Sequence, residues 1–263
     1  MMISEKLALE TQHCAVRAEF ERQAPSWAAS EARPELAWVV DQLELASDMN
    51  VLDVAAGTGL FGAAIAPHVR RVTAVDLAPK MLELGVIRAK QRGIKNMDFT
   101  CGTAEALPFA TASFDLVVTR YSIHHMLMPI DVLSEMTRVC RSGGTVAVVD
   151  MVAHENPALA RRQNDLERVA DPTHTVMLSP SALVLLAAEA GLTLRTYLSR
   201  DVVVDFRRWQ SHLNDDSPPK RTIRSALEAD IAGDMPTGFR PFIQEERLKF
   251  HHVWGVAIAC RLS

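Results

Sequence analysis

The chain has 263 residues, with 28 Lys and Arg against 32 Asp and Glu, which gives a formal net charge of −4. This length is ample for one large domain with its own hydrophobic core. The 48% hydrophobic and 23% charged fractions exclude a disordered or fibrous chain. A slightly acidic chain gives no electrostatic reason to bind nucleic acid.

The chain has no sequence signal for export or for a membrane. Its first residues, MMISEKLALETQHC, are charged and contain no apolar h-region. The longest wholly apolar run, residues 182–188, is too short to span a bilayer. The cysteines Cys14, Cys101, Cys140 and Cys260 are scattered and form no CxxC pair. We therefore expect free thiols, no metal site, no membrane insertion and a cytoplasmic location.

The first half of the chain alternates between short apolar runs and helical patterns. Two helical stretches, 4–24 and 34–45, come first. Strands are then expected at 50–56, 71–76, 97–101, 114–119 and 144–151, with helices at 60–69, 78–92 and 130–140. Strands that alternate with helices at this spacing predict right-handed crossovers and a parallel sheet covered on both faces, which is a doubly wound α/β fold.

The pattern is looser after residue 151. We expect helices at 156–170 and 180–191, a strand at 192–206, a polar helical insertion at 207–232 and a last strand at 253–260. The last two strands are expected to run antiparallel, because little chain is left for a crossover helix. The prediction is one domain, 1–263, with a mostly parallel seven-stranded sheet. Residues 1–45 and insertions within 153–263 would form a helical lid.

A glycine-rich loop follows the first strand. Gly57, Gly59 and Gly62 spell GxGxxG, which is typical of dinucleotide binding but weak alone, since a tight turn also needs glycines. Asp53 lies four residues before Gly57, where a carboxylate repels a pyrophosphate and attracts an amino group. This favours S-adenosylmethionine (SAM) over a nicotinamide cofactor. The sequence also has no Tyr-x-x-x-Lys pair after Tyr121 for hydride chemistry.

Asp76 ends the second strand, 17 residues after Gly59. At the carboxyl edge of the sheet its carboxylate can accept both ribose hydroxyls of a nucleoside. Alternatively it caps the following helix, since Ala78 and Pro79 come next. Leu77 would offer an apolar face to the adenine.

Four segments together resemble a known family. VLDVAAGTG, VTAVDLAPKML, CGTAEALPFATASFDLVVTRYSIHHM and RVCRSGGTVAVVD occur in the order and spacing of the class I SAM-dependent methyltransferases. The likeness is greatest to the branch of the ubiquinone and menaquinone C-methyltransferases, and it covers residues 48–152. It implies a Rossmann-like methyltransferase fold, SAM as cofactor and S-adenosylhomocysteine as product. It implies cofactor contacts at Asp53, Ala55, Gly57, Gly59, Asp76, Leu77, Met81, Thr103, Ala104, Glu105 and Arg120.

Two positions depart from the family pattern. Ala55 stands where the family often has its first glycine, which narrows the loop. Thr103 stands where an acid commonly reaches the adenine amino group. A hydroxyl can still accept that hydrogen bond, or Ala104 and Glu105 can provide it.

Methyl transfer requires a base only when the acceptor must lose a proton. His124 and His125 are the candidates, because their loop is expected at the carboxyl ends of the strands. One ring should face the pocket and the other the following helix; alternatively both are structural. Candidate substrate contacts are Trp27, Tyr121, His174 and Trp209, although ordinary packing is the more common role of such tryptophans.

The sequence thus predicts an enzyme that moves a methyl group from SAM to an O, N or C atom of a small molecule in biosynthesis. A nicotinamide-dependent oxidoreductase and a SAM-binding protein without methyl transfer are the alternatives. The expected partner is a small-molecule substrate and no nucleic acid; monomer and homodimer both stay open.

Overall fold

The computed structural model describes residues 3–28, 34–209, 213–214 and 216–262. Its strands are β1 (Asn50–Val54), β2 (Arg71–Asp76), β3 (Met97–Cys101), β4 (Phe114–Arg120), β5 (Cys140–Val152), β6 (Leu192–Asp205), β7 (Phe242–Gln244) and β8 (Arg247–Arg261). Its α-helices are α1 (Ile3–Ala28), α2 (Pro34–Val40), α3 (Leu60–Ile65), α4 (Pro79–Gln91), α5 (Pro129–Val139), α6 (Pro157–Ala170), α7 (Pro180–Glu189) and α8 (Pro218–Ala232). Two short 3₁₀ helices, η1 (Ala66–His68) and η2 (Ile123–His125), complete the order.

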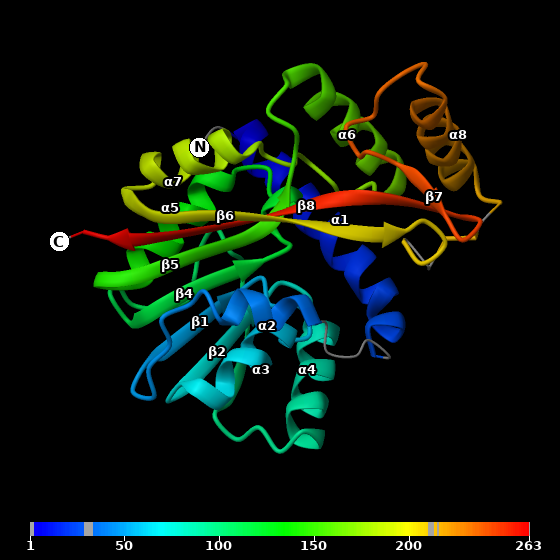
Figure 1. Ribbon diagram of the computed structural model, residues 1–263. Helices are drawn as coiled ribbons and strands as arrows, with labels where there is room; N and C mark the ends of the chain where they lie inside the picture. The colour runs from blue at the N-terminus through cyan, green and yellow to red at the C-terminus, as the bar shows by residue number, and fades with distance from the viewer. Residues whose placement is uncertain (1–2, 29–33, 210–212, 215, 263) are drawn as a thin grey trace.

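Seven strands follow one another in the order β3-β2-β1-β4-β5-β8-β6 (Figure 1). The strands from β3 to β5 pair in parallel, and β8 is antiparallel to both β5 and β6. The predicted doubly wound, mostly parallel sheet is therefore confirmed. The short β7, which forms a hairpin with β8, was not expected, because three residues leave no readable alternation.

Helices cover both faces of the sheet, as a parallel sheet requires. On one face α5 and α7 bury Leu133, Met136 and Leu183 against β4 and β5. On the other face α2 and α3 bury Val39 and Phe61. Each fully buried side chain of this size contributes about 1.5–3 kcal/mol, so these two layers hold the strand ends in place.

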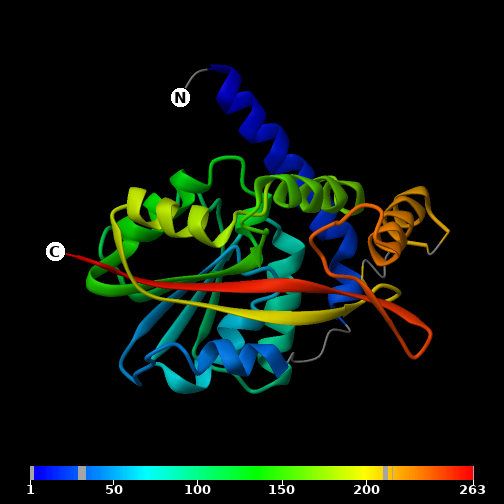
Figure 2. The same ribbon diagram turned by 45° about the horizontal axis from the view of Figure 1, so that its top comes forward.

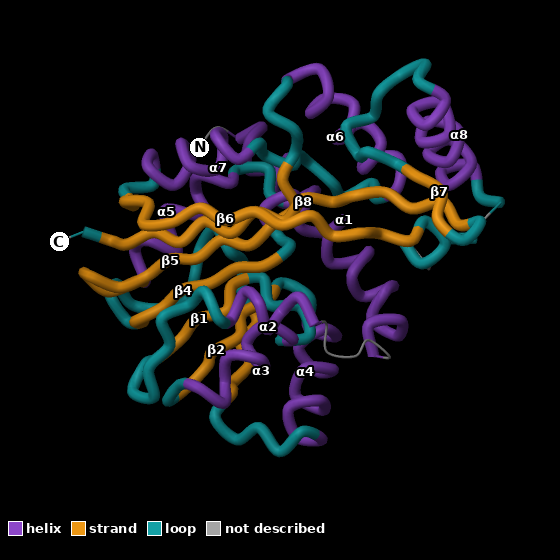
Figure 3. The backbone as a smooth tube through the Cα atoms, viewed as in Figure 1, coloured by secondary structure: helices purple, strands orange, loops and turns teal. Residues whose placement is uncertain are grey.

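The long strands β6 and β8 continue past the rest of the sheet toward α8 and β7 (Figure 3). There Phe206, Leu227, Phe239 and Phe250 form a separate apolar cluster with α6 and α8. The helix expected from residue 207 begins only at Pro218, because a proline fits the first turn of a helix but not its interior. The last strand also begins earlier than expected, at Arg247 instead of residue 253.

The order of the strands reverses between β1 and β4, and ligands of doubly wound sheets bind outside the carboxyl ends at such a point. Helix α1 packs beside this edge. Its C-terminal half contacts α4 through Phe20 and Ala24 against Ala78 and Met81, while its N-terminal end projects outward (Figure 2).

Candidate functional site

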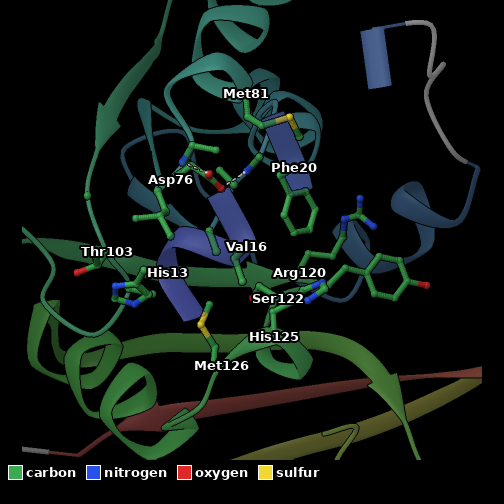
Figure 4. A pocket seen from close by; sticks show the side chains of 18 of the residues that line it. His13, Val16, Phe20, Asp76, Met81, Thr103, Arg120, Ser122, His125 and Met126 are labelled. Atoms are coloured by element: carbon green, nitrogen blue, oxygen red, sulfur yellow. Dashed lines mark hydrogen bonds between the residues drawn. The ribbon is translucent and has the colours of Figure 1, made fainter. Parts of the chain in front are cut away.

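A cavity of about 1030 Å³, including its open mouth, lies at the carboxyl ends of β1, β2 and β4. Its size suits a small-molecule site. Figure 4 shows side chains from α1 opposite those of the strand ends. The wall is made by Gln12, His13, Val16, Phe20, Ala55, Ala56, Gly57, Thr58, Leu60, Asp76, Leu77, Ala78, Met81, Gly102, Thr103, Ala104, Glu105, Arg120, Tyr121, Ser122, His125 and Met126.

Two residues with an unfavourable backbone conformation lie where β1 and β4 reach the cavity. Ala55 has φ 52° and Tyr121 has φ 53°, both in the left-handed region that disfavours residues with a side chain. Gly57, with φ 57°, adopts the same region without this cost. Ala55 therefore holds a conformation that a glycine would adopt at a lower cost. Strain of this kind gathers at ligand sites, where the surrounding structure holds it in place.

Asp76 connects two loops of the cavity. Its Oδ2 accepts a hydrogen bond from the Gly57 N–H at 2.7 Å, and its Oδ1 accepts one from the Ala78 N–H at 2.8 Å. Burial raises the pKa of this carboxyl, and these N–H groups act in the opposite direction. A carboxylate has about four acceptor positions, so room is left for the hydroxyls of a ligand. The ribose and helix-cap interpretations of Asp76 are compatible.

The structure corrects the role expected for Asp53. Its side chain is only 1% exposed and is not on the cavity wall. Its Oδ2 accepts a hydrogen bond from the Gly62 N–H at 2.8 Å, within the loop. Burial raises the pKa of Asp53 to about 7, against the opposing Gly62 N–H and the charge of Arg120. The carboxyl thus supports the glycine loop through Gly62, behind the cavity wall.

Of the other residues expected to contact the cofactor, all but Gly59 lie on the cavity wall. Ala55, Gly57, Leu77, Met81, Thr103, Ala104, Glu105 and Arg120 lie on the cavity wall with Asp76. Gly59 does not, because it begins α3 behind the loop. The carboxylate of Glu105 faces His13 of α1 at 3.1 Å from Nε2. This contact joins the loop after β3 to the helix that covers the cavity.

The two neighbouring histidines have different positions. His125 lies on the cavity wall, whereas His124 points below it to Asp150 at the end of β5, with Nδ1 and Oδ1 2.6 Å apart. Burial opposes the charged form of His124, but the carboxylate of Asp150 outweighs it and raises the pKa. Burial and the charge of His124 lower the pKa of His125 to about 3. The second ring therefore faces β5, not the following helix as expected.

The expected substrate contacts are mostly elsewhere. Tyr121 is on the cavity wall, and its ring packs edge-on against Trp254 at 4.7 Å. His174 is buried behind His124, with its Nε2 2.8 Å from Asn164 Oδ1. Trp209 packs against Phe250 in the cluster at the far end of β8. The side chain of Trp27 lies outside the described residues.

Helix α1 supplies four wall residues that the sequence analysis did not identify. Gln12, His13, Val16 and Phe20 repeat at helical spacing, so they share one face. The sequence contained a signal for them: Val16 and Phe20 are an apolar pair four residues apart, and Gln12 and His13 beside them are polar side chains that could bind a ligand. Within the described ranges, no residue after 126 lines the cavity, so α8 is not part of its cover.

In the described part of the chain no group of three His, Cys, Asp or Glu side chains could hold a metal ion. Among the helices described, none combines the length and apolar character needed to cross a bilayer.

The fold and the cavity define a doubly wound α/β protein with a small-molecule-sized cavity at its switch point, and comparison with known proteins identifies the family. The methyltransferase domain family matches residues 52–148. The uncharacterized protein YafE of Escherichia coli is 31% identical over 157 residues, which are 60% of this chain and 75% of YafE. The chain thus belongs to the class I SAM-dependent methyltransferases, whose cofactor is SAM. This excludes the nicotinamide alternative.

Other relatives agree in sequence and in structure. The uncharacterized methyltransferase YcgJ of Bacillus subtilis is 35% identical over 53% of this chain and 55% of its own. Its crystal structure superposes with a TM-score of 0.78 at 25% identity, covering 87% of this chain and 98% of that one. The ubiquinone/menaquinone biosynthesis C-methyltransferase UbiE of Rhizobium meliloti is 37% identical over 43% of this chain and 46% of its own. The sequence match therefore spans about half of YcgJ and UbiE.

The buried histidines predict a specific pH dependence. Burial lowers the pKa of His174 to about 3 from an ordinary 6.5. The neutral ring stabilises the fold above pH 6.5, and this stability is lost as the pH falls toward 3. We expect His174→Asn to be less stable than wild type at pH 7.5, and the difference to shrink by about 1–2 kcal/mol at pH 5. Urea unfolding at both pH values measures this, and a constant difference would contradict it.

Proposed function

We propose that the cavity holds SAM between the glycine loop and the segment after β3. Asp76 would bind the ribose hydroxyls through its remaining lone pairs, as its position at the end of β2 supports. Leu77 and Met81 would contact the faces of the adenine, and Thr103 with Ala104 its polar edge. The guanidinium of Arg120 suits the carboxylate of the methionine part. When bound there, SAM supplies an activated methyl group.

The rest of the wall is mainly apolar and would take the acceptor. Val16 and Phe20 of α1 lie opposite Tyr121 and Met126, and His125 is the imidazole among them. This arrangement suits a small, largely apolar molecule, consistent with the aromatic and apolar lining of small-molecule sites. No strong positive patch on the wall calls for a nucleic acid.

The single observation that carries the proposal is the position of the His125 imidazole on this wall, beside Phe20 of α1. Its pKa of about 3 keeps it unprotonated at neutral pH, so it can accept a proton. The carboxylates of Asp171 and Asp150 favour the charged ring that results. A general base serves an acceptor that must lose a proton, such as a phenol, an enol or an activated C–H. The chain would then act as a small-molecule methyltransferase with His125 as general base.

The cofactor part of the proposal predicts a loss of SAM binding in Asp76→Ala. We expect at least a tenfold weaker affinity, because one hydrogen bond to a charged group contributes about 1.5–3 kcal/mol. Calorimetric titration with SAM and S-adenosylhomocysteine measures it. Asp98→Ala, an exposed carboxylate on the neighbouring strand β3, is the matched control. Unchanged affinity in Asp76→Ala would place the cofactor elsewhere.

The acceptor part predicts that His125→Gln loses turnover while SAM binding is kept. A general base contributes about 10²–10⁴-fold, so release of S-adenosylhomocysteine should fall by at least about 10²-fold in a screen of phenols, enols and acidic C–H compounds. His154→Gln, an exposed histidine, is the control. Full turnover in His125→Gln would show that His125 is not the general base. SAM binding without product release from any acceptor would contradict methyl transfer itself.

A further inference from the structure

The ring of His125 is held by a loop far away in the sequence. Residues 171–175 follow α6 and run alongside η2. In this loop the hydroxyl oxygen of Thr173 lies 3.1 Å from His125 Nδ1, and the Thr173 carbonyl oxygen lies 3.3 Å from the same nitrogen. Both residues are buried, at 4% and 7% exposure. One ring nitrogen is therefore enclosed by two oxygens of one residue.

The direction of these hydrogen bonds determines where the imidazole proton is. The Thr173 hydroxyl donates to Asp171 Oδ1 at 2.7 Å, so its oxygen has only lone pairs left for His125. The Thr173 carbonyl can only accept. Asp171 is the charged partner: burial opposes its ionisation, but the hydrogen bonds from the Thr173 hydroxyl and N–H lower its pKa. Nδ1 must therefore carry the proton, and Nε2 carries the lone pair.

Helix α1 holds the same two residues from the other side. The Nε2 amide of Gln12 donates one hydrogen bond to the His125 carbonyl and one to the Thr173 carbonyl, each at 2.9 Å. Phe20, two turns further along α1, packs edge-on against the His125 ring at 5.2 Å between centroids. Helix α1 thus holds the loop of residues 171–175, and this loop in turn orients the His125 ring.

We propose that Thr173, held by Asp171 and clamped by Gln12 of α1, is the positioning residue that keeps His125 protonated on Nδ1 and basic on Nε2. In the described part of the chain no hydrogen-bond partner contacts Nε2, so this atom is left for the acceptor. Asp171 and Thr173 orient the base and do not touch the reacting atoms. The inference rests on the proposed function of His125 and adds the residues through which the ring is set.

The ring nitrogen states can be measured without any acceptor, so failure of this inference differs from failure of the methyl-transfer proposal. Protein labelled with ¹⁵N-histidine is observed at pH 7.5 by long-range ¹H–¹⁵N NMR, with His125→Gln to assign the signal. The charged or titratable groups around the ring are His124, Asp150 and Asp171, with His13 and Glu105 on the same cavity wall. We expect the Nδ1–H tautomer in the wild type. A dominant Nε2–H tautomer would overturn the proposal.

Thr173→Val removes the hydroxyl at nearly constant volume, and Thr173→Ser retains it. We expect Thr173→Val to shift the ratio of the two tautomers by about tenfold toward Nε2–H, the effect of losing one hydrogen bond. Thr173→Ser should keep the wild-type signal. Thr11→Val, the same change at an exposed position of α1, is the control. An unchanged tautomer in Thr173→Val overturns the role of the hydroxyl.

Gln12→Ala tests the clamp. Loss of both amide hydrogen bonds should speed backbone hydrogen exchange across the middle of α1 and raise the Nε2–H fraction of His125, while Thr11→Val leaves both unchanged. Wild-type exchange and a wild-type tautomer in Gln12→Ala would show that α1 does not hold the ring.

Discussion

The carboxylate of Asp76 is the interaction on which the site depends. It ends β2, and it joins the glycine loop after β1 to the first turn of α4 through the N–H groups of Gly57 and Ala78. A second carboxyl, Asp53, is buried behind the cavity wall. It also holds the glycine loop, because it accepts a hydrogen bond from the Gly62 N–H. Together they hold a turn in which Ala55 has an unfavourable backbone conformation. The shape of the cavity mouth follows from these hydrogen bonds.

The opposite side of the cavity is built from segments far apart in the chain. Helix α1 contributes the cover, η2 the imidazole of His125, and the loop after α6 the oxygens that orient that ring. Two buried pairs below, His124 with Asp150 and His252 with Glu167, tie this region to β5 and β8. Such buried pairs are costly to break because removing one partner leaves an uncompensated group. They give the acceptor side a rigid support.

Much of the fold and of the cofactor side could be predicted from the sequence. The strand ends and the loop from Asp53 to Gly62 are short contiguous patterns, and their order gives the switch point. The acceptor side could not be predicted in the same way. The contact of Gln12 with Thr173 joins residues 161 positions apart, and the few apolar residues of α1 do not indicate which part of the sheet they face. His174 was expected near the substrate because its loop resembles the family's lid region, and Trp209 because an aromatic ring suits a planar acceptor; both pack inside the protein instead.

In the proposed complex, a single cavity holds the cofactor against Asp76 and presents its methyl-bearing end to His125. A crystal structure of the complex with S-adenosylhomocysteine tests it most directly. The account predicts ribose hydroxyls on the Asp76 carboxylate, adenine against Leu77 and Met81, and the thioether sulfur directed to the space between Phe20 and His125. A ligand bound outside this cavity, or one whose sulfur faces away from His125, would contradict it.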